Sequence, residues 1–238
     1  MNDIPTVFIL AAGAGSRFPN GVKQLLPVYN DEPIVYRTIR LVHEFDPRIP
    51  IYMVTWRKEL MFNNLITIDT KKPTTSASDS VLFAEPWWGK ANLFLHGDAI
   101  YCRDSLHNML GSCGDFHLYG KVHDDNPFAK HPEGNIQREQ FALSFPIEDK
   151  DLIMKACVGA GDLQGFRGLC LALYPNLLAF SRTQKIPRCA RDFLFYHVIW
   201  KFKNFYVSPR GFVELYDHTT DIDTPEEYKE FIEHETTP

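Results

Sequence analysis

The sequence predicts an α/β domain of three layers, in which helices cover both faces of a mostly parallel β-sheet. Two observations support this fold class. Strand and helix patterns alternate through the first half of the chain, as they do in βαβ units. The length of 238 residues fits one large domain, given an average of about 150 residues per domain. We therefore expect a single domain over residues 1–238.

The first half of the chain begins with a buried strand at Thr6–Ala12 that leads into a glycine-rich turn. A helix is predicted at Ile34–Phe45, because apolar side chains recur there at helical spacing after Pro33. Shorter β-rich and helical runs then alternate. We expect strands at Ile51–Trp56, Leu65–Ile68 and Asn92–Leu95 and helices at Ser78–Ala84 and Asp104–Leu110, the last of them ended by Gly111.

The second half gives weaker patterns. A polar stretch that contains Pro and Gly, Val122–Gln137, is expected to be a long loop. A strand at Phe141–Phe145 and a helix at Glu148–Val158 follow it. Periodicity does not decide between helix and strand for the aromatic run from Phe193 to Phe205.

The last element has a clear start. Thr224 and Glu227 have the spacing of a capping box, and Pro225 suits the first position of a helix. Tyr228 and Phe231 then share one face of this helix. We expect that face to dock on the body of the domain.

Composition excludes several classes of function. The chain has 25 basic and 30 acidic residues, a net charge of −5, which argues against non-specific nucleic-acid binding. No window approaches the roughly 20 apolar residues of a membrane span. The 5 cysteines form no close pair, which is typical of reduced thiols. We expect a cytoplasmic protein without nucleic-acid or membrane partners.

The glycine-rich turn after the first strand is a candidate phosphate site. Gly13 and Gly15 carry no Cβ, so backbone N–H groups can approach a polyphosphate closely. A Walker loop would end in Gly-Lys-Ser/Thr, whereas this turn ends in Ser16, Arg17 and Phe18. A dinucleotide-binding turn would have a third glycine at position 18. Both of these interpretations are therefore weakened.

Two sequence runs together carry a family resemblance. Residues 10–18 read Leu-Ala-Ala-Gly-Ala-Gly-Ser-Arg-Phe, and residues 23–29 read Lys-Gln-Leu-Leu-Pro-Val-Tyr. This pattern resembles that of the nucleotidyltransferases that make sugar nucleotides. The second run is most similar to the glucose-1-phosphate thymidylyltransferases. The resemblance implies a Rossmann-like, mostly parallel mixed sheet and one catalytic domain.

Two later segments extend the resemblance. Residues 93–101 are similar to a family strand that ends in Gly-Asp, which implies that Asp98 binds the catalytic metal. A carboxylate at the C-terminal end of a parallel strand also faces the ligand crevice of α/β sheets. Residues 221–228 resemble the Asp-Thr-Pro-Glu segment of molybdopterin- and sugar-acid cytidylyltransferases, which implies Asp223 as the second ligand and Asp221 as the reserve. These acids could instead only favour the positive end of the following helix.

The resemblance implies a role for each remaining candidate residue. Arg17 and Lys23 would be catalytic, and Mg²⁺ would be the cofactor held by the two aspartates. The hydroxyl-rich stretch after residue 73 would read the nucleobase, although it could equally cap the next helix. Glu139 could hold sugar hydroxyls or lie at the surface. The nucleotide-binding set is Leu10, Ala11, Ala12, Gly13, Ala14, Gly15, Ser16, Thr75, Ser76 and Ser78.

The implied reaction joins an NTP to a phosphorylated small molecule, with a sugar 1-phosphate as the first candidate, and releases pyrophosphate. Three alternatives stay open: a cytidylyltransferase acting on a non-sugar phosphate, a metal-dependent glycosyltransferase, and a non-catalytic nucleotide-binding protein. The chain lacks the Glu-Lys-Pro segment through which the thymidylyltransferases hold the sugar phosphate. Lys121, Lys130 and Lys155 are candidate replacements, although each could be an ordinary solvated lysine. The nucleobase, the acceptor and the oligomeric state are not determined by the sequence.

Overall fold

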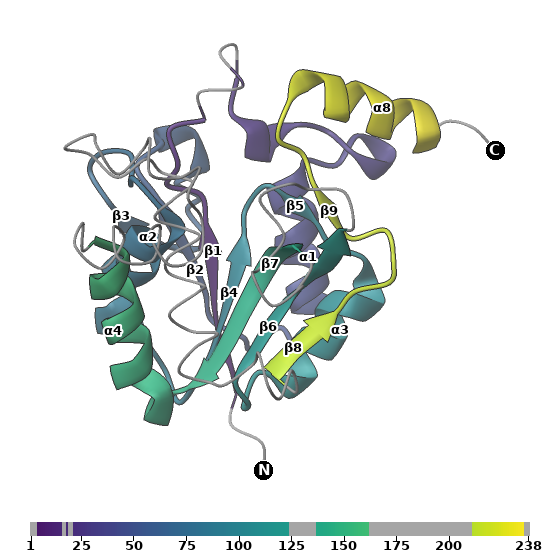
Figure 1. The fold of residues 1–238 in the computed structure, drawn as a ribbon. Helices are drawn as coiled ribbons and strands as arrows, with labels where there is room; N and C mark the ends of the chain where they lie inside the picture. Colours follow the sequence, from purple (N-terminus) through teal and green to yellow (C-terminus); the bar gives the residue numbers. More distant parts are fainter. Residues whose placement is uncertain (1–3, 16–17, 19–20, 124–136, 162–210, 236–238) are drawn as a thin grey trace, which may run out of the picture.

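A seven-stranded sheet forms the centre of the computed structural model (Figure 1), which describes residues 4–15, 18, 21–123, 137–161 and 211–235. Its strands are β1 (Thr6–Leu10), β2 (Ile51–Thr55), β3 (Ile66–Asp69), β4 (Ala91–His96), β6 (His117–His123), β7 (Gln137–Pro146) and β8 (Phe212–Glu214). Their order across the sheet is β3-β2-β1-β4-β7-β6-β8. Only β7 runs against the other six, since it pairs antiparallel with both β4 and β6. The predicted mostly parallel mixed sheet is confirmed.

Helices cover the two faces of this sheet, as predicted. Figure 1 places α1 (Ile34–Phe45) and α3 (Arg103–Ser112) on one face and α2 (Ala77–Phe83) and α4 (Lys150–Gly161) on the other. Alternate side chains of a strand point to opposite faces. Val7 and Ile9 therefore pack in the core beneath α1 and α3, and Phe8 packs beneath α2 and α4. Each face of β1 is buried, which explains its continuous apolar run.

Two expectations about element boundaries were wrong. Gly111 does not end the helix, because α3 continues to Ser112, whose hydroxyl donates to the Asn108 carbonyl (2.7 Å). The expected loop Val122–Gln137 was too long at both ends, because β6 and β7 pair through Val122 with Arg138 and His123 with Gln137. Backbone hydrogen bonds pair the two strands there although the side chains are polar, so the polar pattern did not predict strands. The predicted aromatic run from Phe193 lies outside the described residues.

A small second sheet brings the end of the chain beside β4. It consists of β5 (Ala99–Ile100) and β9 (Thr220–Asp221), paired antiparallel with Ala99 opposite Asp221. Ile222 follows β9 and is buried in the same cluster as Ile100. The sequence did not predict either strand. Their pairing fixes the segment after β9 next to the segment that ends β4.

The terminal helix, α8 (Pro225–Glu235), starts at the predicted capping box. The Thr224 hydroxyl accepts a hydrogen bond from the Glu227 backbone N–H (3.2 Å), and the Glu227 carboxylate accepts one from the Thr224 N–H (3.0 Å). Tyr228 donates its hydroxyl proton to the Pro27 carbonyl (2.6 Å). The helix is thereby docked on the segment that precedes α1. No helix in the described part of the chain is long and apolar enough to cross a membrane.

The turn after β4 leaves no room for a side chain at Gly97. A Cβ there would lie 2.9 Å from the Leu10 carbonyl oxygen, which already accepts a hydrogen bond from the Gly97 N–H (2.9 Å). We expect Gly97→Ala to lower the free energy of unfolding by about 1–3 kcal/mol, because it overpacks a rigid backbone contact. Urea denaturation followed by circular dichroism measures this change.

Gly111→Ala is the matched control. A Cβ at this helical glycine would meet nothing within 4 Å. The control should be neutral or stabilising, by up to about 1 kcal/mol. Equal stability of the two variants would contradict the close contact between the β4 turn and β1.

Candidate functional site

Three predicted residues meet at the C-terminal edge of the sheet. The Lys23 Nζ lies 2.9 Å from Asp98 Oδ2 and 2.9 Å from Asp223 Oδ1. The Lys23 side chain is 8% exposed, against 27% for Asp98 and 42% for Asp223. A buried ammonium therefore lies between two carboxylates that remain accessible to solvent.

Each member of this cluster is positioned by a different local structure. Lys23 begins a short 3₁₀ helix, Lys23–Leu25, and its Nζ lies 5.9 Å from the centre of the Phe18 ring. Asp98 follows Gly97 in the turn between β4 and β5. Asp223 lies between β9 and α8, where its backbone N–H donates to Glu227 (2.6 Å). The capping residue of α8 thus also fixes the backbone of Asp223.

The two aspartates favour the protonated, charged form of Lys23. Burial by itself lowers the pKa of Lys23, but the charges of Asp98 and Asp223 and the hydrogen bonds to both outweigh it. The pKa of Lys23 is therefore raised above its ordinary value. Lys23 stays protonated at neutral pH and can attract phosphate oxygens as well as the two carboxylates.

The glycine-rich loop lies at the same edge, after β1. Gly15 has a φ of +65°, a left-handed conformation that glycine adopts without strain. A pocket of about 350 Å³ opens beside it, lined by Ala14, Gly15, Phe18, Gly21, Val22, Arg57 and Glu59. Ser16, predicted to bind the nucleotide, and Arg17, predicted to be catalytic, lie outside the described residues. Leu10 ends β1, and Ala11 and Ala12 are buried just after it.

Two residues at the end of β2 were missed by the sequence interpretation. The Arg57 guanidinium donates from Nη2 to the Ala14 carbonyl (2.8 Å), and the Trp56 Nε1 donates to the Gly13 carbonyl (3.4 Å). The signal available in the sequence was their position directly after a strand of a parallel sheet, at the edge where ligands bind.

The hydroxyl-rich stretch caps a helix. Ser76 accepts a hydrogen bond from the Asp79 backbone N–H (3.2 Å) at the start of α2, and its hydroxyl contacts that of Ser78 (2.7 Å). The Thr75 hydroxyl donates to the Asp79 carboxylate. The Thr74 N–H donates to the Ala12 carbonyl (2.9 Å), so this stretch lies beside the glycine loop. Capping explains these hydroxyls, and a role in base recognition stays a prediction.

The other candidate residues are spread more widely. Asp221 is in β9, two residues before Asp223, and its role as a reserve ligand stays a prediction. Glu139 is in β7 opposite Lys121 of β6, and its side chain lies outside the described part of the chain. Lys155 is exposed on α4, as expected for a solvated lysine, and Lys130 lies outside the described residues.

The donor set fits a magnesium ion. Asp98 and Asp223 each direct a carboxylate oxygen to the same cationic group, the Lys23 Nζ. Mg²⁺ is usually held by one or two carboxylates together with substrate phosphates and water. Among the described residues, no group of three or more His, Cys, Asp and Glu could hold a metal. Phosphate oxygens or water would therefore complete the coordination.

Comparison with known proteins identifies the fold. No family model and no curated protein matches the sequence. A protein from Bacillus anthracis assigned as a glucose-1-phosphate thymidylyltransferase, solved with sucrose, matches 98% of this chain and 96% of its own at 16% identity, with a TM-score of 0.58. A UTP-bound UGPase from Acinetobacter baumannii matches 98% of this chain and 93% of its own at 14% identity, with a TM-score of 0.61. The chain has the fold of the nucleotidyltransferases that form sugar nucleotides. The predicted resemblance is confirmed for this nucleotidyltransferase fold.

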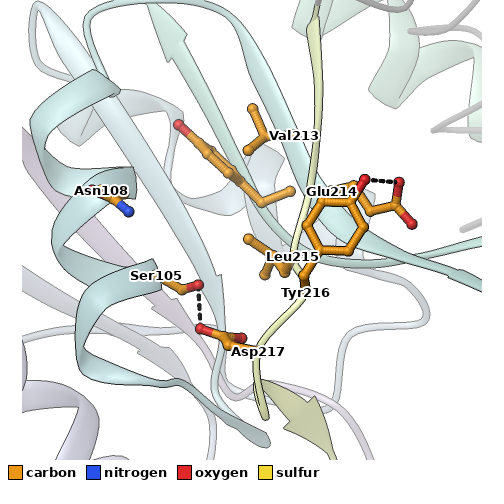
Figure 2. Close-up of a pocket in the computed structure, with 8 residues that line it drawn as sticks. Ser105, Asn108, Val213, Glu214, Leu215, Tyr216 and Asp217 are labelled. Atoms are coloured by element: carbon orange, nitrogen blue, oxygen red, sulfur yellow. Dashed lines mark hydrogen bonds between the residues drawn. The ribbon is translucent and has the colours of Figure 1, made fainter.

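The structure has a second pocket, away from the predicted residues. It lies between α3 and the segment that begins in β8 (Figure 2). It has a volume of about 410 Å³. Within it, the Ser105 hydroxyl donates to Asp217, and the Tyr216 hydroxyl donates to Glu214 (2.7 Å). Burial raises the pKa of Asp217, but hydrogen bonds from Ser105 and from the Thr219 N–H outweigh it and hold that pKa below its ordinary value. Asp217 therefore fixes a turn of the chain.

The charge of Lys23 should contribute to stability. In Lys23→Met the two carboxylates would lose their shared counterion and repel each other. We expect the free energy of unfolding to fall by about 1–3 kcal/mol, less than for a fully buried pair because both acids are partly solvated. Urea denaturation at pH 7 measures the change.

Lys229→Met is the control for this variant. Lys229 Nζ lies 3.7 Å from Glu233 Oε1 on α8, with side chains 77% and 65% exposed. Removal of this solvated pair should change stability by less than about 0.5 kcal/mol. A Lys23→Met variant as stable as the control would contradict a compact ion cluster.

Proposed function

We propose that the chain is a Mg²⁺-dependent nucleotidyltransferase that joins an NTP to a sugar 1-phosphate. One observation carries the proposal: the Lys23 ammonium lies within 2.9 Å of both Asp98 and Asp223, beside a glycine loop at the ligand-binding edge of the sheet. The UTP in one structural neighbour and the thymidylyltransferase name of another support an NTP as substrate. The proposed domain is the whole of residues 1–238.

The reaction is an in-line displacement at phosphorus. An oxygen of the acceptor phosphate attacks the α-phosphorus of the NTP, the bond from that phosphorus to the oxygen bridging to the β-phosphate breaks, and pyrophosphate leaves. The charge rests mainly on phosphate oxygens throughout. Catalysis of this kind depends on positioning and charge neutralisation rather than covalent participation by the protein.

The residues divide this work. Backbone N–H groups of the glycine loop bind the NTP phosphates, and the ammonium of Lys23 binds the acceptor phosphate and the α-phosphate. Asp98 and Asp223 hold Mg²⁺, which neutralises charge on both reactants when bound. Asp98 and Asp223 also orient Lys23, because both contact its Nζ.

Pyrophosphate release tests the proposal directly. The protein is incubated with Mg²⁺, with ATP, GTP, CTP, UTP or dTTP, and with a panel of sugar 1-phosphates and non-sugar phosphates. We expect release with at least one pair, and none when EDTA replaces Mg²⁺. Nucleotide binding without release from any pair would favour a non-catalytic binding protein. Nucleoside diphosphate release from a nucleotide-sugar would favour a glycosyltransferase.

Site variants test the assignment of roles. Lys23→Ala, Asp98→Ala and Asp223→Ala should each lower kcat by about 100-fold or more, because each removes charge neutralisation that the transition state requires. Circular dichroism should show that the variants remain folded. Lys229→Ala, on the exposed face of α8, serves as the control and should retain wild-type turnover. Near-normal kcat in the site variants would place the reaction elsewhere.

A further inference from the structure

Three consecutive residues at the C-terminal end of β2 and directly after it contact the carbonyl groups of the glycine loop and of the residues that lead into it. The Thr55 hydroxyl donates to the Ala11 carbonyl (3.2 Å). The Trp56 Nε1 donates to the Gly13 carbonyl (3.4 Å), and the Arg57 Nη2 donates to the Ala14 carbonyl (2.8 Å). We call Thr55, Trp56 and Arg57 the β2 brace. It holds three of the carbonyls between β1 and Gly15.

The brace is itself held firmly. The Arg57 backbone N–H donates to the Thr55 hydroxyl (3.0 Å), and the Arg57 guanidinium lies 4.8 Å from the centre of the Trp56 ring. This distance is within cation–π range. Thr55 is fully buried. In the described part of the chain no carboxylate forms an ion pair with Arg57, so its donors are directed to backbone rather than to an acid.

Holding the carbonyls determines where the amide groups point. In a trans peptide the C=O and the following N–H point in opposite directions. With the Ala11, Gly13 and Ala14 carbonyls turned toward the brace, the N–H groups of Ala12, Ala14 and Gly15 turn away from it. The left-handed Gly15 lets the chain continue in this arrangement. Successive backbone N–H groups that are not used within the protein can form an anion-binding surface.

We infer that Trp56 and Arg57 are positioning residues for the nucleotide polyphosphate, which they serve by orienting the amide groups of the glycine loop. The inference rests on the proposed function, since it takes an NTP as the ligand. The tight contact at Gly15 supports the same role, because a Cβ there would lie 2.9 Å from Arg57 Nη2. The guanidinium is thus packed directly against the loop that it orients.

The experiment compares Trp56→Phe, Arg57→Ala and Arg57→Lys with Lys58→Ala. Lys58 is the next residue, is exposed, and carries the same charge as Arg57, so its variant controls for net charge. Calorimetry measures affinity for the NTP that the wild-type protein binds most tightly and for inorganic tripolyphosphate, both with Mg²⁺. Steady-state kinetics then give separate KM values for the NTP and the acceptor, and thermal unfolding gives Tm.

We expect Arg57→Ala to bind both phosphate ligands about tenfold more weakly and Trp56→Phe about threefold more weakly, from the loss of one oriented hydrogen bond each. In a double variant that combines Trp56→Phe with Arg57→Ala, the loss of affinity should be smaller than the product of the two single losses, because the two side chains stack. The acceptor KM and Tm should stay close to wild type. Lys58→Ala should match wild type throughout.

Several results would overturn the inference. Affinity within about twofold of wild type in Arg57→Ala and Trp56→Phe would show that the brace does not orient the amides. Full recovery in Arg57→Lys, with no loss in Trp56→Phe, would show that Arg57 acts through charge alone. If the wild-type protein binds tripolyphosphate but releases pyrophosphate with no substrate pair, the proposed function is contradicted. The role of Trp56 and Arg57 in phosphate binding is then still supported if their variants bind tripolyphosphate more weakly. If the wild-type protein binds neither the NTP nor tripolyphosphate, the proposed function and this inference are both overturned.

Discussion

The ammonium of Lys23 lies between two carboxylates from widely separated parts of the chain, at 2.9 Å from each. The positive charge of Lys23 offsets the repulsion between these two carboxylates. Much of the surrounding structure serves this arrangement. The Gly97 N–H ties the turn that precedes Asp98 to the end of β1, the pairing of β5 with β9 brings the end of the chain to the same place, and the first turn of α8 fixes the Asp223 backbone.

The sheet divides the remaining work among its parallel strands. β1 delivers the glycine loop, β2 delivers the Trp56–Arg57 contacts that orient it, and β4 leads to Asp98, all at the C-terminal edge. A parallel sheet is well suited to this task because neighbouring strands end at the same edge. In the proposed reaction, backbone amides, the Lys23 ammonium and a bound Mg²⁺ would together supply local attraction for phosphate in a chain whose net charge is −5.

Strong local patterns made much of the fold predictable. α1 was predicted at its observed bounds because its apolar stripe has helical period, and α8 because Thr224 and Glu227 form a capping box. Lys23, Asp98 and Asp223 were predicted as site residues through motif resemblance, and the structure shows the contacts that join them. β5 and β9 were missed because two-residue strands are too short to show alternation. Trp56 and Arg57 were missed because their position after a strand was the only signal, and hydrogen bonds to backbone carbonyls add no residue pattern to it.

The proposed sharing of one cation by Asp98 and Asp223 is tested most directly by Mn²⁺ binding. Electron paramagnetic resonance can titrate Mn²⁺ into the wild-type protein, Asp98→Asn, Asp223→Asn and the double variant, each with saturating nucleotide. If the two carboxylates share one ion, each single variant should lose nearly as much Mn²⁺ affinity as the double variant. Wild-type affinity in either single variant would contradict a shared site.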